Sequence, residues 1–65
     1  EPKEEFKVVK SKRFFVNPLS VDEAILQMNL LGHQFFLFRN AETEELNVVY
    51  KRNDGNYGLL EPEND

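Results

Sequence analysis

The side chains that could do chemistry in this chain are few and scattered. Among 65 residues there is one histidine, His33, and there is no cysteine. A metal site would therefore need His33 together with carboxylates from acidic segments, because thiolate ligands are missing. His33 directly follows Gly32, a position typical of a helix exit, where an imidazolium interacts favourably with the last carbonyls. We expect no metal site and no cofactor.

The carboxylates do not form a catalytic pair either. Glu42, Glu44 and Glu45 lie between two apolar segments and are expected in a solvated loop, whereas acid–base pairs need enclosure. The run Asp54-Gly55-Asn56 is too short to be a calcium-binding loop. The chain has no glycine-rich phosphate loop and is too short to build a deep pocket. We predict that it is not an enzyme.

Basic residues concentrate in the N-terminal quarter, although the net charge is −4. That overall charge argues against a domain that holds nucleic acid by its general field, because phosphate binding needs concentrated Lys and Arg. Two interpretations stay open: a strand edge protected by solvated charges, or a direct contact with RNA phosphates or the ribosome. The residues concerned are Lys7, Lys10, Lys12 and Arg13.

Chain length sets the next constraint. A domain of this size can bury roughly 60% of its unfolded surface, so its stability is marginal without help. Disulfides are excluded by composition, and oligomerisation is the remaining usual remedy. The apolar runs are too short for a membrane span and no leader pattern is present, so we expect a soluble, cytoplasmic protein without a membrane partner. Residues 1–5, charged and containing Pro2, are interpreted as a linker remnant from a longer protein.

A helix is predicted from Val21 to Leu31. Ser20 and Glu23 have the spacing of a capping box, and acidic residues in the first turn suit the helix dipole. Gly32 supplies the left-handed residue that commonly ends a helix. The expected buried stripe consists of Val21, Ala24, Ile25, Met28 and Leu31.

Leu26 and Leu30 fall outside that stripe, on an otherwise polar flank of the helix. Two explanations stay open for this second apolar patch. Either the N-terminal strand or a loop folds over it, or it contacts a partner.

Strands are predicted on both sides of the helix. Phe6 to Val16 is interpreted as one long or interrupted strand that ends at Asn17-Pro18, because proline lacks the ladder donor. Three further strands follow, at Gln34 to Arg39, Leu46 to Arg52 and Tyr57 to Glu61. These elements predict an α+β fold: a small antiparallel β-sheet of about four strands with one α-helix packed on one face, in the order β-α-β-β-β.

Turn chemistry predicts how the strands align. Asp54-Gly55 is a strong signal for a two-residue type I′ turn, which would place Tyr50 opposite Leu59. The first connection is interpreted as a four-residue loop, Ala41 to Glu44, so that Asn40 faces Glu45. A loop one residue longer or shorter would exchange the two faces. The helix is then expected to cover Phe36, Phe38, Val49 and Leu60 with Ile25, Met28 and Leu31.

The segment Gln34 to Arg39 is apolar on both faces, and this is the main functional signal. One small core can cover a single face, so a second copy of the chain is the simplest cover for the other. We therefore predict an obligate or near-obligate homodimer. Base stacking by exposed rings is a weaker alternative, because aliphatic residues rather than Lys or Arg lie between the rings. The predicted dimer interface is Phe35, Leu37, Val48, Tyr50, Tyr57 and Leu59.

The block from Lys12 to Pro62 resembles the C-terminal domain of the long hibernation-promoting factors of bacteria, the ribosomal protein S30EA or sigma-54 modulation family. The first hairpin departs from the family pattern, which often has a glycine where this chain has Glu44-Glu45. The matching stretches are Lys12-Arg13-Phe14, Asn17 to Ala24, Gln27 to His33, Phe35 to Asn40, Asn47 to Arg52 and Asp54 to Pro62.

The resemblance implies a function that the residues alone do not name. In that family an N-terminal domain, absent from this sequence, binds the small ribosomal subunit and blocks translation. The C-terminal domain pairs with its counterpart on a second ribosome, so that two inactive ribosomes are tethered in stationary phase or stress. Residues 6–65 would then be the dimerisation domain of a longer protein, with exchange of the N-terminal strand between protomers. The alternative is a small ribosome-associated module that binds RNA through its basic N-terminal strand.

Overall fold

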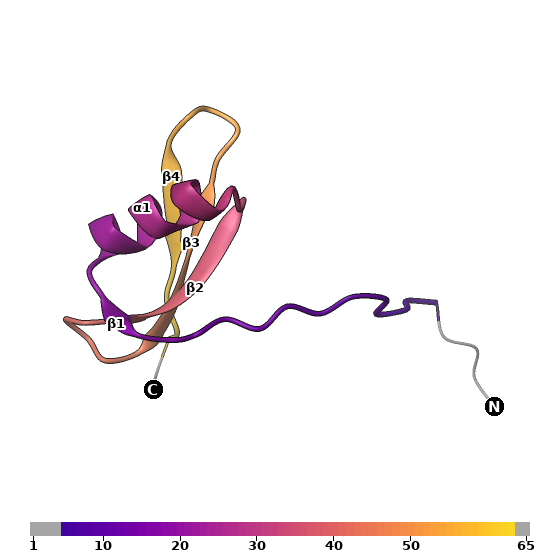
Figure 1. Ribbon diagram of the computed structural model, residues 1–65, viewed down its shortest axis with the longest axis horizontal. Helices are drawn as coiled ribbons and strands as arrows, with labels where there is room; N and C mark the ends of the chain where they lie inside the picture. The colour runs from indigo at the N-terminus through magenta and orange to yellow at the C-terminus, as the bar shows by residue number, and fades with distance from the viewer. Residues whose placement is uncertain (1–4, 64–65) are drawn as a thin grey trace.

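The computed structural model describes residues 5–63, which form one helix and a four-stranded sheet (Figure 1). The sheet order is β1-β2-β3-β4, and helix α1 packs on one face. This confirms the predicted α+β fold and its β-α-β-β-β order. The predicted linker remnant lies outside the described residues except for Glu5. The elements are β1 (Pro18–Leu19), α1 (Val21–Leu31), β2 (Phe35–Asn40), β3 (Leu46–Lys51) and β4 (Tyr57–Leu60).

The sheet is mixed rather than purely antiparallel. β1 runs parallel to β2, whereas β2 with β3 and β3 with β4 are antiparallel. Helix α1 connects β1 to β2 and returns the chain to the same end of the sheet, as a parallel pair requires. The long strand predicted over Phe6 to Val16 is wrong, because β1 begins only at Pro18. Two backbone hydrogen bonds make the short pairing of β1 with β2. The Asn17 carbonyl accepts from the Arg39 amide, and the Leu19 carbonyl accepts from the Ala41 amide at 2.9 Å.

Helix α1 has the predicted bounds and both predicted ends. Glu23 donates its amide to Ser20 Oγ at 3.1 Å, and Ser20 donates its amide to Glu23 Oε1 at 3.0 Å. Gly32 has φ of 72° and ends the helix, with the His33 amide donating to the Met28 carbonyl. These bonds satisfy orphan backbone groups at both ends, so the helix is fixed by its local sequence.

The core lies between α1 and one face of the sheet. Its buried residues come from the helix and from the two central strands, with Leu19, Val21 and Ile25 packed against them. Leu31, predicted for the buried stripe, is 54% exposed instead. The buried apolar residues are Ala24, Met28, Phe36, Phe38 and Val49.

The first hairpin has the predicted register. Asn40 donates its amide to the Glu45 carbonyl at 2.8 Å, which closes a four-residue loop from Ala41 to Glu44. Phe35 consequently lies opposite Tyr50, and Phe36 lies opposite Val49.

The predicted register of the second hairpin is wrong by one residue. Arg52 donates its amide to the Asn56 carbonyl, so the loop has three residues, and Tyr50 lies opposite Gly58 rather than Leu59. A type I′ turn needs positive φ at both central residues, but in this loop only Gly55 has one, at 88°. This is the three-residue arrangement in which a left-handed glycine follows a type I turn.

Candidate interaction surface

The sheet face opposite α1 carries apolar side chains from three strands and is called the open face below. Phe35 is 43% exposed and Leu60 is 56% exposed. Leu37, Val48 and Tyr50 are half-buried between them. The apolar residues of the open face are Phe35, Leu37, Leu46, Val48, Tyr50 and Leu60, and the exposed Arg39 lies on the same face opposite Leu46.

The structure brings together four of the six residues predicted for the dimer interface: Phe35, Leu37, Val48 and Tyr50. The shifted register of β4 turns Tyr57 and Leu59 to the helix side, where Asn29 Nδ2 donates to the Tyr57 hydroxyl at 3.2 Å.

Leu46 and Leu60 take their place on the open face, and neither was among the residues predicted for the interface. Leu46 is 44% exposed and could have been found from strand alternation alone, because it lies two residues before Val48. Leu60 was predicted for the helix side, and its correct face depends on the length of the second turn, which determines the register of β4.

The edge of β2 is only partly covered. β1 pairs with Arg39 and Asn40, and no other strand among residues 5–63 lies beside the Phe35 to Phe38 part of that edge. The Phe14 ring lies there, with its centroid 5.8 Å from Phe35 and 5.6 Å from Phe36. Unpaired edges of this kind are templates for pairing with another chain.

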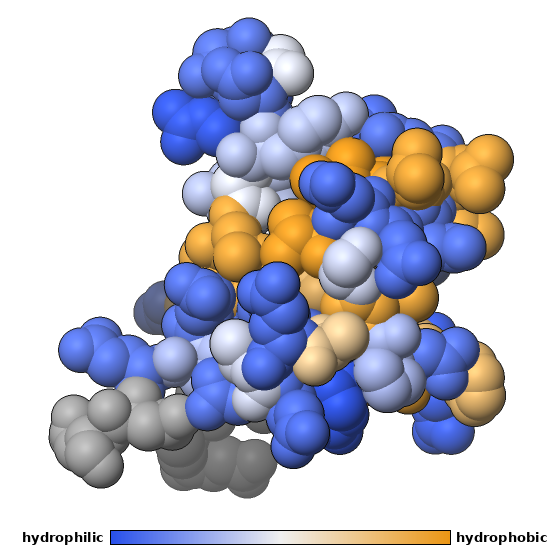
Figure 2. All heavy atoms as spheres, turned by 90° about the vertical axis from the view of Figure 1, so that its left-hand side faces the viewer, coloured by the Kyte–Doolittle hydropathy of each residue, from blue (hydrophilic) through white to orange (hydrophobic). Residues whose placement is uncertain are grey.

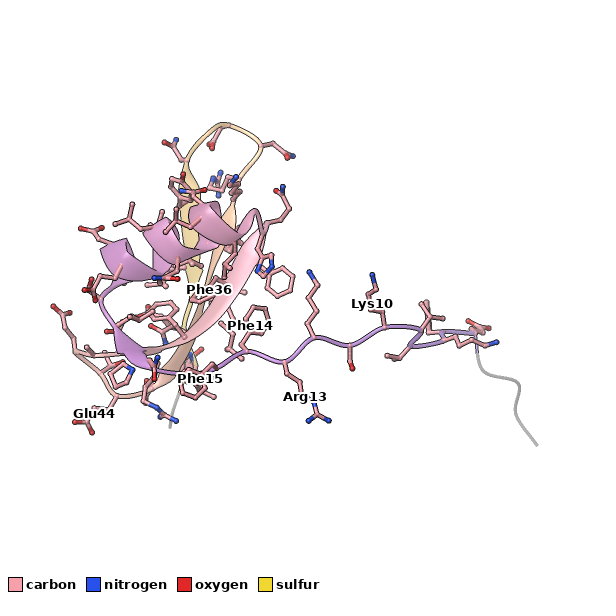
Figure 3. All side chains as sticks on the ribbon, viewed as in Figure 1. Lys10, Arg13, Phe14, Phe15, Phe36 and Glu44 are labelled. Atoms are coloured by element: carbon pink, nitrogen blue, oxygen red, sulfur yellow. The ribbon has the colours of Figure 1, made fainter. Side chains whose placement is uncertain are left out.

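Residues 5–13, called the arm below, extend away from the folded body (Figure 1). Phe6, Val8 and Val9 are each more than four-fifths exposed, so their apolar surface contacts little of this chain. Lys10 and Arg13 project from opposite sides of the arm (Figure 3). The arm therefore presents the predicted basic residues to solvent: Lys7, Lys10, Lys12 and Arg13.

A groove of about 540 Å³ separates the end of the arm from the second half of α1. Gln27 and Leu31 line it from the helix, and Phe14 and Phe15 line it from the other side. Phe15 is 86% exposed although its neighbour Phe14 packs on β2. The groove thus continues the partly covered edge of β2 on the helix side.

His33 packs against Phe14 at the end of α1. Its ring meets Phe14 edge to face, with centroids 5.9 Å apart, and its Nδ1 atom is buried without a hydrogen-bond partner among the described residues. Its backbone amide completes the helix exit. Within residues 5–63 no three potential ligands among His, Asp and Glu gather closely enough to hold a metal ion. In the same span, no helix has the length and apolar character needed to cross a bilayer.

Leu26 and Leu30 remain uncovered, with 62% and 80% of their surface exposed. The arm does not fold over them, so the first of the two explanations given for this patch is wrong for the described part of the chain. Figure 2, a view from the left-hand side of Figure 1, shows hydrophobic side chains reaching the surface among polar ones.

The second hairpin holds an acid with a lowered pKa, Asp54. The amide of Asn56 donates to Asp54 Oδ1 at 3.0 Å and lowers the pKa of this carboxyl below its ordinary value. Arg52 Nε adds a weaker bond to Oδ2 at 3.3 Å. Because the group is exposed, this stabilises the loop locally and does not create a reactive site.

Comparison with known proteins agrees with the resemblance noted from the sequence. The family model described as Sigma 54 modulation/S30EA ribosomal protein C terminus matches residues 3–59. A Ribosome hibernation promotion factor of Bacillus subtilis (strain 168) is 60% identical over 62 residues. That alignment covers 95% of this chain and 33% of the relative, so the chain spans about a third of that protein's length.

Proposed function

The chain belongs to the Sigma 54 modulation/S30EA ribosomal protein C-terminal family, and on that premise we propose that it is a homodimerisation module of a ribosome hibernation factor. Two copies would pair through their open faces. The observation that carries the proposal is the apolar surface left on the sheet opposite α1.

The open face suits a second copy of the same chain. A two-fold contact brings the same patch from both partners together, so a surface that is apolar across three strands covers itself. Aromatic residues are favoured at the centre of such interfaces, and Phe35 lies directly opposite Tyr50 on neighbouring strands. Burying this face would add a second apolar core, shared with the partner, to a chain of 65 residues.

The arm supplies a second contact in the proposal. Phe6, Val8 and Val9 have β-forming side chains but no neighbouring strand among residues 5–63. In a dimer, each arm would lie against the partner subunit, where the partly covered β2 edge can accept a strand. Exchange of identical segments is an inexpensive way to form dimers.

In the full-length protein, the dimer would join two inactive ribosomes. An N-terminal domain beyond this sequence would bind the small subunit, and pairing of the present domain would tether two such complexes in the cytoplasm. Translation would then stay silenced in stationary phase or stress.

Sedimentation equilibrium of the 65-residue chain tests the proposal directly. We expect the mass of a dimer at micromolar concentration. A well-folded monomer across that range would contradict it, and circular dichroism on the same samples confirms whether the chain is folded.

A second candidate function is direct binding of ribosomal RNA through the arm. The observation in its favour is that all four basic residues of the arm are exposed on an extended segment. Binding of the isolated chain to RNA should then weaken steeply with salt, because each phosphate contact releases counterions. No binding at low salt would exclude this function.

A further inference from the structure

Gly58 occupies a position where the backbone does not require glycine. It lies in β4, directly opposite Tyr50 of β3, and unlike Gly32 and Gly55 it has no positive φ. Glycine inside a strand is unfavourable, since it gives up conformational entropy and has no side chain to pack. Its presence here therefore calls for a reason outside the backbone.

The reason lies in the neighbouring ring. A Cβ atom built on Gly58 would overlap Cζ, Oη and Cε1 of Tyr50, far inside van der Waals contact. The Tyr50 ring therefore lies flat across the backbone of β4, in the space that any other residue at position 58 would fill. The opposite neighbour of Tyr50 is Phe35 of β2, so Phe35, Tyr50 and Gly58 form one cross-strand row of the open face.

We propose that Gly58 is a positioning residue for self-association: it lets Tyr50 lie flat, and the flat ring gives the open face the shape that a second copy can cover. The inference rests on the proposed dimerisation. A methyl group at position 58 would push the ring away from the sheet, because it would meet the far end of a side chain that can rotate, whereas the backbone of β4 is held by its pairing with β3. The raised ring would then hold two open faces apart.

A double-mutant cycle tests this coupling. Gly58→Ala in the otherwise natural chain should raise the dimer dissociation constant about tenfold or more, the range expected for residues in contact. In a Tyr50→Ala background, the same substitution should change the dissociation constant less than about twofold, because no ring is left to displace. Equal effects in the two backgrounds would overturn the proposal, since they would reflect a general change in β4.

A second measurement works without any variant at position 58. The Hα resonances of Gly58 should be shifted upfield by the Tyr50 ring current, and this shift should disappear in Tyr50→Ala. Absence of the shift in the natural chain would overturn the proposal even if Gly58→Ala failed to fold. If the shift is present but the natural chain is monomeric, the contact between Tyr50 and Gly58 is correct. The proposed dimerisation is then wrong, and so is the proposed role of Gly58 in it.

Discussion

Asn40 Nδ2 donates a hydrogen bond to Asn47 Oδ1 at 2.9 Å, and both side chains are almost fully buried, with 5% and 2% of their surface exposed. The remaining groups are used as well. Asn40 Oδ1 accepts from the Glu42 amide, and Asn47 Nδ2 donates to the Leu46 carbonyl. The two buried side-chain amides thus join β2 to β3 and hold the first loop, at the end of the sheet beyond the hydrophobic core.

Replacing one partner should be costly. Asn47→Ala leaves Asn40 Nδ2 buried without an acceptor, and we expect the free energy of unfolding to fall by about 1–3 kcal/mol. Urea unfolding at fixed protein concentration measures the change. The matched control is Asn53→Ala in the exposed second loop, which should change stability by less than about 0.5 kcal/mol. A loss no larger than that of the control would show that the pair contributes little.

Truncating the aromatic pair on the open face tests the proposed interface. Phe35→Ala or Tyr50→Ala should weaken dimerisation by about 2 kcal/mol, or about 30-fold in dissociation constant, because large aromatic residues dominate interface centres. Sedimentation gives the dissociation constants. The control is Leu26→Ala, an exposed leucine of α1, which should leave dimerisation unchanged. A larger effect of Leu26→Ala than of Phe35→Ala or Tyr50→Ala would indicate that the interface lies on α1 instead of the open face.

Leu59 and Leu60 are adjacent in β4 and point to opposite faces of the sheet, so substitutions at these two positions test the two faces independently. Leu60→Ala should weaken the dimer, because Leu60 pairs with Val48 on the open face. Leu59→Ala should instead lower the free energy of unfolding and leave the residues of the interface in place, because Leu59 lies opposite the buried Val49. Measuring unfolding and dimerisation for both variants distinguishes these effects. The reverse pattern would support the register predicted from the sequence.

Local chemistry made α1 predictable, since its capping box and its final glycine act within a few residues. The second turn shows where such reasoning ends. Asp54-Gly55 fits a two-residue loop and a three-residue loop equally well, because both place Gly55 at positive φ. The choice depends on distant contacts, namely Tyr50 over Gly58 and Tyr57 near Asn29. Because the observed register differs from the predicted one by one residue, every side chain of β4 lies on the face opposite to its predicted face.

The prediction of a strand from Phe6 to Val16 was wrong for a different physical reason. Apolar and β-branched residues favour an extended chain, but a strand exists only beside another strand. In a single copy, residues 5–16 have no strand that pairs with them along their length within the described range 5–63. The sequence pattern thus identified an exposed apolar segment but not whether a strand lies beside it.

The first loop contains a residue in an unfavourable conformation. Glu44 has φ of 64° and is the one non-glycine residue with positive φ in the described chain. This conformation costs an L-residue about 1–2 kcal/mol, whereas glycine adopts it freely. We expect Glu44→Gly to raise the free energy of unfolding by about 1 kcal/mol, measured by urea unfolding. Glu42→Gly removes the same charge from a residue without positive φ and should not stabilise the chain; equal gains would point to charge instead.

The Asp54 carboxyl makes the second hairpin sensitive to acid. Its pKa is lowered in the folded chain, chiefly by the Asn56 amide, so its contribution to stability is present above the unfolded pKa of about 4 and is lost as pH falls through the lower folded value. NMR titration of the Asp54 carboxyl carbon should give a midpoint below that of an unfolded reference peptide. Arg52→Ala should recover only a minor part of this difference, because the Asn56 amide is the larger cause. A midpoint at or above the reference would rule out the bond from Asn56, and Asp54→Asn should remove this step from the pH dependence of stability.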